Sequence, residues 1–291
     1  MPTNMDVKII EQPILPPRHK NSHKGTFGTA VLICGSYGMA GAAVLAGKAA
    51  LRGGLGIAKI ILPDKIYDIV ARQIPEAVFV PLKTSIDGTL CCEDIPKICE
   101  HIKSADSLLF GCGSGISRDN AEILKSLIEN AKCPFIIDAD GINLLSQNID
   151  IIKQTEADII LTPHPGEMSR LTGKSIAEIE ADRVKTARAF TDKYGVITVL
   201  KGAETVVATR NDTYLNTIGN AGMATGGSGD TLSGILAAFL AREVDIDLAV
   251  TAAVWVHSAA GDAAAKRLSQ ISMLPSDMID ELPCLFKKLE G

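Results

Sequence analysis

The stretch NAGMATGGSGDTL, residues 220–232, combines four glycines with a single acid, Asp230. After the acid, one face of a buried helix is indicated by the apolar residues Leu232, Ile235, Leu236, Phe239 and Leu240. The first N–H groups of a helix lack internal partners and carry the positive end of its dipole, and glycines let a ligand approach them closely. We therefore predict a helix that begins near Asp230 and an anion site, of the kind that holds phosphate, at its start.

Asp230 itself has two interpretations. It can simply cap the helix. Alternatively, the glycine loop neutralises a transferring phosphoryl group while the acid accepts the proton of the attacking hydroxyl. The density of glycines favours the second interpretation. The motif is not a Walker A loop, because no Lys-Ser/Thr follows the last glycine, and its spacing differs from that of the dinucleotide fingerprint GxGxxG.

Apolar segments of two kinds alternate along the chain. Strands are expected at residues 28–35, 57–63, 107–113, 133–140, 157–167 and 196–202, and helices at 41–54, 119–131 and 175–195. Strands that are nearly all apolar and separated by helices indicate a parallel sheet that is covered on both faces. The fold class is thus α/β.

Two segments depart from this alternation. Residues 204–217 contain two alternating runs around Asn211-Asp212, which predicts an antiparallel hairpin at the edge of the sheet. Residues 1–24 are rich in proline and lack periodicity, so we expect an extended N-terminal arm. No linker or repeat interrupts the pattern, and residues 1–291 are interpreted as one domain.

Composition excludes several classes of function. The net charge of -5 gives no global basic field to attract nucleic acid or an anionic membrane, and aromatic residues make up only 4%. The longest apolar runs are far shorter than the roughly 20 residues that span a bilayer, and no signal peptide is evident, so a cytoplasmic location is expected. The seven cysteines show no CxxC spacing and are interpreted as small buried hydrophobes.

Ligands of open α/β sheets bind beyond the carboxyl ends of the strands, where several polar residues of this chain gather. Asp138 and Asp140 end one strand and either bind Mg²⁺, order a substrate or cap the next helix. Lys201 ends another strand, where it can meet a phosphate or lie in an ordinary turn. His164 stands between two prolines that fix its direction, in a binding site or in a rigid surface turn. His257, in an apolar helix, is interpreted as a core histidine.

Several motifs together resemble a known family. GGSGD at the start of a helix resembles the ribokinase-like fold, which implies a three-layer α/β/α sandwich. Nearly the whole chain after residue 20 is similar to the stand-alone bacterial ADP/ATP-dependent NAD(P)H-hydrate dehydratases, through residues 22–56, GCGSG (111–115), LTPHPGEMSRLTG (161–173), VLKGAETVV (199–207), residues 220–234 and HSAAGDAAA (257–265). The chain departs from the family's GPGLG, because Cys112 replaces the proline and Ser114 the leucine.

The resemblance implies a nicotinamide nucleotide repair enzyme, a hydro-lyase. ADP or ATP would phosphorylate the ring hydroxyl of hydrated NADH or NADPH, and loss of phosphate would restore NAD(P)H, with Mg²⁺ as cofactor. It also implies a homo-oligomer, with a tetramer as the expected form, that works with an NAD(P)H-hydrate epimerase on a separate chain. The alternatives are a small-molecule kinase of the same fold, similar to hydroxyethylthiazole kinase, and a nucleotide sensor without catalysis.

The resemblance also assigns roles to residues. Asp230 is the expected catalytic base. The residues expected to bind the substrate are Ala42, Ala43, Gly113, Gly115, His164 and Asp230. Those expected to bind the adenine nucleotide are Lys201, Gly202, Ala203, Glu204, Thr205, Gly227, Ser228 and Gly229. No metal ligand is assigned, although Glu167 either organises its loop or helps to hold Mg²⁺ through water.

Overall fold

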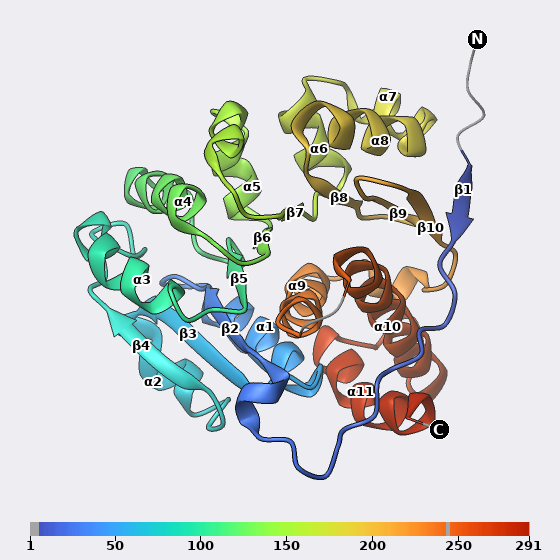
Figure 1. The fold of residues 1–291 in the computed structure, drawn as a ribbon, viewed down its shortest axis with the longest axis horizontal. Helices are drawn as coiled ribbons and strands as arrows, with labels where there is room; N and C mark the ends of the chain where they lie inside the picture. The colour runs from blue at the N-terminus through green and yellow to red at the C-terminus, as the bar shows by residue number, and fades with distance from the viewer. Residues whose placement is uncertain (1–5, 243–244, 291) are drawn as a thin grey trace.

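The centre of the computed structural model, which describes residues 6–242 and 245–290, is a ten-stranded sheet (Figure 1). Its strands lie in the order β1-β10-β9-β8-β7-β6-β5-β2-β3-β4. All neighbours are parallel except that β9 is antiparallel to both β8 and β10. The strands are β1 (Val7–Ile9), β2 (Thr29–Ile33), β3 (Ile57–Pro63), β4 (Val78–Leu82), β5 (Ser107–Phe110), β6 (Phe135–Ile137), β7 (Ile159–Leu161), β8 (Ile197–Leu200), β9 (Thr205–Ala208) and β10 (Thr213–Asn216).

Helices cover both faces of this sheet. One face packs against α1 (Ala40–Arg52), α2 (Asp64–Ala71), α9 (Ser228–Leu240), α10 (Ile246–Arg267) and α11 (Pro275–Leu289). The other packs against α3 (Ile95–Ile102), α4 (Arg118–Asn130), α5 (Asp140–Leu145), α6 (Pro165–Thr172), α7 (Ile176–Ala181) and α8 (Arg183–Tyr194). Within β2, Leu32 belongs to the first core and its neighbours Val31 and Ile33 to the second, as the period of two in a strand requires. The predicted three-layer α/β/α sandwich is confirmed.

Three details differ from expectation. The helix predicted for residues 175–195 is two helices, because the carboxylate of Asp182 accepts a hydrogen bond from the Lys185 N–H and starts α8 separately. The hairpin of β9 and β10 is present, but it does not form the edge. The edge is β1, which pairs in parallel with β10 and places residues 7–9 of the expected arm in the sheet. Residues 1–5 of that arm lie outside the described part.

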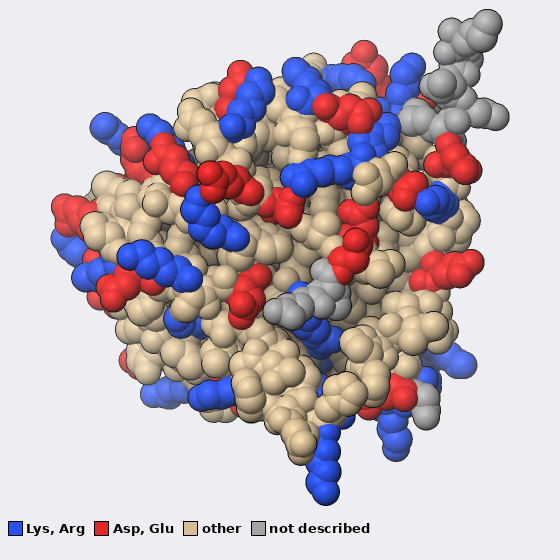
Figure 2. Space-filling model, in the orientation of Figure 1, with Lys and Arg blue, Asp and Glu red and all other residues tan. Residues whose placement is uncertain are grey.

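The surface and the interior agree with the composition. On the face shown in Figure 2, basic and acidic side chains are interspersed. Within residues 6–242 and 245–290, no helix has both the length and the apolar character needed to cross a bilayer. The interpretation of the seven cysteines as buried hydrophobes is only partly right: Cys34, Cys91 and Cys112 are buried, Cys92, Cys99 and Cys133 are partly buried, and Cys284 is exposed. His257 is a core histidine as predicted, with its Nε2 3.0 Å from the Ser228 carbonyl oxygen.

Candidate active site

Helix α9 begins at the predicted glycine loop, with an open first turn. Its N-cap is Gly227, whose φ of 96° lies in the left-handed region, and a Cβ there would lie 2.5 Å from Cδ1 of Leu45. The Ser228 N–H donates to the Thr225 carbonyl at 3.2 Å, whereas in the described part of the chain the N–H groups of Gly229 and Asp230 have no acceptor. Two backbone donors at the positive end of the helix are therefore open to an anion.

Asp230 is the third residue of α9, so the interpretation that it caps the helix is wrong. One potential ligand atom each from Asp230, Asp138 and Cys112 lie within 4.8 Å of one another. Burial, followed by the charge of Asp138, raises the pKa of Asp230 to about 6, although a hydrogen bond from Cys112 and the charge of Lys201 oppose the shift. A carboxylate with this pKa is ionised at neutral pH and still binds a proton well, which suits a general base.

A buried ion pair lies beside Asp230. Nζ of Lys201, at the end of β8, is 2.7 Å from Oδ1 of Asp138, at the end of β6, and Ser233 donates to Oδ2 of Asp138 at 2.8 Å. Burial opposes both charges, but the Lys201 charge and the hydrogen bonds lower the pKa of Asp138, and the carboxylates of Asp138 and Glu167 raise the pKa of Lys201. Both groups are therefore ionised.

The Lys201 ammonium also lies next to the anion site. A Cβ placed on Gly229 would be 3.3 Å from Lys201 Nζ. The structure thus brings together two open N–H groups, one ammonium and one carboxylate of raised pKa at the start of α9. These are the groups that a phosphoryl transfer to a hydroxyl requires.

His164 is fixed by the start of a helix, where the sequence indicated only a turn. It is the N-cap of α6: its N–H donates to Oε2 of Glu167 at 2.8 Å, and its Nδ1 accepts from the N–H groups of Gly166 at 3.0 Å and Glu167 at 3.3 Å. Nδ1 is therefore occupied as an acceptor, and the ring proton lies on Nε2. Burial lowers the pKa of His164, so the ring is neutral at pH 7.

Glu167 links His164 to the ion pair. Its Oε2 lies 3.8 Å from Lys201 Nζ, and the Lys201 N–H donates to the Pro163 carbonyl at 2.8 Å. Burial raises the pKa of Glu167 to about 7, with Asp138 adding to the effect and Lys201 opposing it. The loop after β7 and the loop after β8 are thus joined at the carboxyl end of the sheet.

The loop after β5 packs against the start of α1. A Cβ on Gly113, whose φ is 60°, would lie 2.7 Å from Cβ of Ala42. Ala42 is 6% exposed and Ala43 is 0% exposed, so of the two only Ala42 retains any access to a ligand. The Gly115 N–H donates to Oδ2 of Asp140 at 2.8 Å. Asp140 is the first residue of α5, whose N-cap is Ala139, so neither Asp138 nor Asp140 caps that helix.

The segment expected to hold the adenine nucleotide is a strained turn between β8 and β9. Glu204 has a φ of 57° and Gly202 one of 152°. Sequence reasoning missed Arg183, whose Nη2 donates to the Leu200 carbonyl at 3.0 Å and whose Nη1 would be 2.5 Å from a Cβ on Gly202. It also missed Ser233, although Ser233 follows Asp230 by three positions and so shares its helix face.

The loops carrying these groups follow β2, β5, β6, β7, β8 and β10 of one sheet, in which β9 separates β8 from β10 (Figure 1). This fold, with an acid and open amides at a helix start, defines the ribokinase-like class. A ribokinase-like superfamily protein from Enterococcus faecalis has a TM-score of 0.82 and 31% identity, covering 94% of this chain and 91% of its own.

Within that class, residues 30–284 match the family model described as NAD(P)H-hydrate dehydratase, and the chain belongs to this family. The ADP-dependent (S)-NAD(P)H-hydrate dehydratase of Bacillus subtilis is 33% identical over 284 residues, which cover 95% of each chain. The crystal structure of an ADP/ATP-dependent NAD(P)H-hydrate dehydratase from Bacillus subtilis, co-crystallised with ATP/Mg²⁺, has a TM-score of 0.87 and 32% identity, covering 98% of this chain and 99% of its own. The chain spans about half the length of several other curated relatives, which are bifunctional NAD(P)H-hydrate repair enzymes.

Proposed function

We propose that this protein restores NADH and NADPH from their hydrated forms in a reaction driven by ADP or ATP. The observation that carries the proposal is the carboxylate of Asp230, with its pKa raised to about 6, in a first helical turn where the N–H groups of Gly229 and Asp230 are open. Membership of the NAD(P)H-hydrate dehydratase family supports the choice of substrate.

In the first step, Asp230 accepts the proton of the hydroxyl on the hydrated nicotinamide ring. The hydroxyl oxygen attacks the terminal phosphorus of the nucleotide, and the bond from that phosphorus to the bridging oxygen breaks. The amides of Gly229 and Asp230 and the ammonium of Lys201 stabilise the charge on the phosphoryl oxygens. The pair with Asp138 holds the ammonium in place, so no reorganisation is needed during transfer.

In the second step, phosphate leaves the ring. The lone pair of the ring nitrogen assists the departure, and loss of a proton from the adjacent ring carbon restores the double bond. Phosphate is a much better leaving group than hydroxide, which explains why a dehydration would consume a nucleotide. The nucleoside phosphate, inorganic phosphate and NAD(P)H are the products.

The proposed binding residues flank this centre. We assign the substrate to Ala42, Gly113, Gly115 and His164, with His164 able to donate from Nε2 because Nδ1 caps α6. Ala43 supports this wall from the interior. We assign the adenine nucleotide to residues 201–205 and to the loop of residues 227–229.

The residues of this site suit Mg²⁺ only when the nucleotide binds with it. A closed Mg²⁺ cage needs hard oxygen ligands, whereas the cluster at Asp230 includes the soft thiol of Cys112, and both oxygens of Asp138 already accept from Lys201 and Ser233. Mg²⁺ would therefore bind together with the nucleotide, and Glu167 and Asp230 would help to hold it through water. When bound, the ion neutralises charge on the transferring group.

We also propose that the chain works in the cytoplasm as a homo-oligomer, with a tetramer as the expected form, beside an NAD(P)H-hydrate epimerase on a separate chain. The bifunctional repair enzymes among its relatives support a working connection between two repair steps.

The test is an assay of hydrated NADH and hydrated NADPH with ADP or ATP, with and without Mg²⁺. Recovery of the absorbance of reduced nicotinamide is expected, and Asp230→Asn should still bind nucleotide but lose turnover. Asp68→Asn, an exposed change of the same charge on α2, is the control and should keep full activity. Accumulation of a stable phosphorylated product instead would favour the small-molecule kinase, and full activity of Asp230→Asn would remove Asp230 from the role of base.

A further inference from the structure

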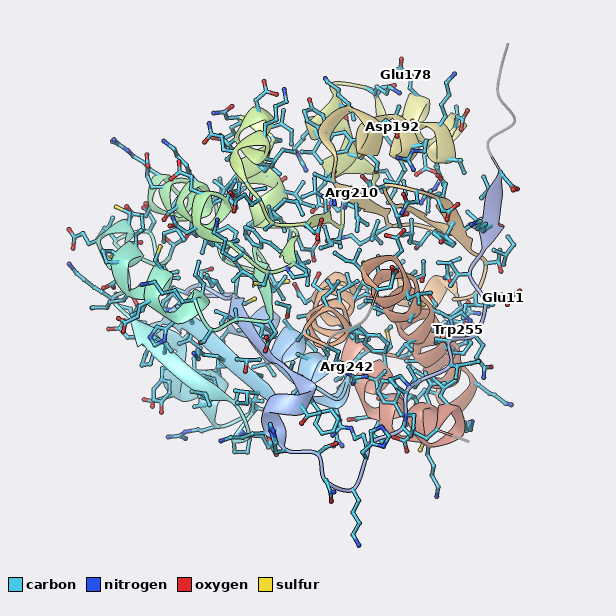
Figure 3. All side chains as sticks on the ribbon, in the orientation of Figure 1. Glu11, Glu178, Asp192, Arg210, Arg242 and Trp255 are labelled. Carbon is cyan, nitrogen blue, oxygen red and sulfur yellow. The ribbon has the colours of Figure 1, made fainter. Side chains whose placement is uncertain are left out.

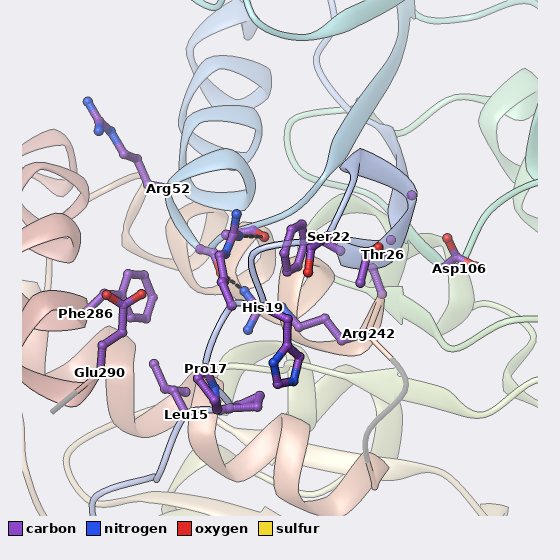
Figure 4. Close-up of a pocket in the computed structure, with 18 residues that line it drawn as sticks. Leu15, Pro17, His19, Ser22, Thr26, Arg52, Asp106, Arg242, Phe286 and Glu290 are labelled. Atoms are coloured by element: carbon purple, nitrogen blue, oxygen red, sulfur yellow. Dashed lines mark hydrogen bonds between the residues drawn. The ribbon is translucent and has the colours of Figure 1, made fainter.

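A cavity lies at the C-terminal ends of α1 and α9, the two helices whose N-terminal ends border the candidate active site. Its volume is about 700 Å³, within the range of small-molecule sites. It is lined by the N-terminal arm from Leu15 to His19, by residues 25–28, by residues 52–54 after α1, by Ala241 and Arg242 after α9, and by Phe286 of α11 (Figure 4). Helix α9 has 13 residues, so about 20 Å separate this cavity from the anion site.

Two arginines, Arg18 and Arg242, meet at this cavity, whereas the side chain of Arg52 points away from it (Figure 4). Arg18 donates to the Gly54 carbonyl, and Nη2 of Arg242 donates to the Gly53 carbonyl at 2.7 Å. Figure 3 shows Arg242 beside the ends of α1 and α9, and Arg52 comes from the last turn of α1. Across residues 6–242 and 245–290, none of the three forms an ion pair with a carboxylate.

Capping of helix carbonyls does not account for this arrangement. Each capping contact uses one of the five N–H donors of a guanidinium, and among the described residues the buried Nε of Arg242 has no partner. Burial and the nearby charge of Arg18 lower the pKa of Arg242, so the two guanidinium groups repel each other in the free protein. An anion between them would relieve the repulsion and supply the missing acceptor.

The acids in the lining do not supply that anion. Oδ2 of Asp106 accepts a hydrogen bond from the Thr29 N–H at 2.7 Å, and Glu290 lies exposed at the end of the described chain. The guanidinium groups of Arg18 and Arg242 adjoin each other at Gly54, and neither of these carboxylates forms an ion pair with them within the described residues, so this part of the cavity favours a negatively charged ligand.

The rest of the lining combines the polar residues His19, Ser22 and Thr26 with an apolar wall. The guanidinium of Arg18 stacks 3.8 Å from the centroid of the Phe27 ring, and Phe286, Leu15 and two prolines complete the wall. Stacked rings and cations beside apolar side chains suit a planar heterocycle that carries phosphate. We propose that this cavity is a second binding site, separate from the candidate active site, that takes a nucleoside phosphate.

The test uses the full chain and AMP. Calorimetric titration is expected to give two AMP sites per chain, one in this cavity and one at residues 201–229. A photoreactive 8-azido-AMP should label peptides that contain Phe27 or Phe286 as well as peptides from the glycine loop. Inorganic phosphate in excess should reduce the label at Phe27 and Phe286, whereas adenosine should compete much less.

Two variants test the arginines. Arg18→Gln/Arg242→Gln should weaken AMP binding in the cavity at least tenfold, because two charge-assisted hydrogen bonds are lost. Arg18→Gln alone, a change at an exposed residue, should weaken it several-fold and guards against misfolding of the double variant. Arg72→Gln, an exposed change at the end of α2, is the matched control and should bind two AMP molecules.

Absence of label at Phe27 and Phe286, or equal labelling in the wild type and both arginine variants, would overturn the second site. Equal competition by adenosine and AMP would also overturn it, since the phosphate would then play no part. In each case, labelling at residues 201–229 shows separately whether the nucleotide binds at the candidate active site, as the proposed function requires.

Discussion

Replacement of Asp230 by asparagine is expected to stabilise the folded protein above pH 6 while it abolishes turnover. The pKa of Asp230 is raised from 3.8 to about 6 in the folded state, because burial and the charge of Asp138 disfavour its ionised form. The folded protein therefore binds this proton more tightly than the unfolded chain does. Asparagine carries no charge at any pH and avoids the cost of ionising a buried carboxyl group.

The cost of ionising Asp230 lowers the free energy of unfolding of the wild type as the pH rises. Below pH 3.8 the carboxyl group is protonated in both states and costs nothing. Between pH 3.8 and about 6 the unfolded chain ionises while the folded protein keeps its proton, so stability falls as pH rises, and above that range the full cost is present. At about 1.36 kcal/mol per pKa unit, the difference between 3.8 and 6 corresponds to about 3 kcal/mol as an upper estimate.

Urea unfolding of the wild type and Asp230→Asn across the range from acid to mildly alkaline pH measures this difference. The variant should gain stability progressively through the titration range, up to about 3 kcal/mol above it. Asp68→Asn, which removes an exposed carboxylate, should show no comparable gain. If Asp230→Asn is equally stable to the wild type at every pH, the carboxylate is fully compensated in the resting protein, and its raised pKa cannot underlie a role as base.

Three further results are expected from the site. The kcat/KM of the proposed reaction should rise with pH through an apparent pKa of about 6, as Asp230 ionises, and a rate independent of pH there would contradict its role. Asp138→Ala should lower the free energy of unfolding by about 3–5 kcal/mol in urea titrations, because Lys201 is left buried without its partner; a loss below about 1 kcal/mol would mean that water replaces the carboxylate. Gly229→Ala should raise the KM for the nucleotide with little effect on unfolding, because its Cβ would lie 3.3 Å from Lys201 Nζ; an unchanged KM would place the phosphates elsewhere.

The sequence predicted the layers and the general place of the site because these depend on local pattern. Alternating apolar runs of strand and helix length indicate a parallel sheet with helices on both faces. Four glycines near the start of a helix indicate an anion site, and this inference does not depend on the tertiary structure. The break at Asp182 was missed, since a helical period runs through it and only the side-chain cap reveals the second start.

The electrostatic partners of the site could not be predicted in the same way. Asp138 and Lys201 are 63 positions apart, and their contact depends on the order of β6, β7 and β8 in the sheet. Arg183 reaches the nucleotide segment from α8, across a different loop. Pairings of this kind arise from tertiary packing, and no local spacing encodes them.

The short strand β1 has a consequence for the margin of the sheet. Its three residues pair with the side of β10 that the hairpin would otherwise leave unpaired. β1 thus becomes the edge strand, and it is too short to pair along its length with a long strand of another molecule. A shortened chain that began after residue 10 would leave β10 as the outermost strand, with unsatisfied amides and carbonyls available to a second molecule. In the full chain, the main effect of β1 would therefore be to protect β10 from pairing with a second molecule and so to limit aggregation.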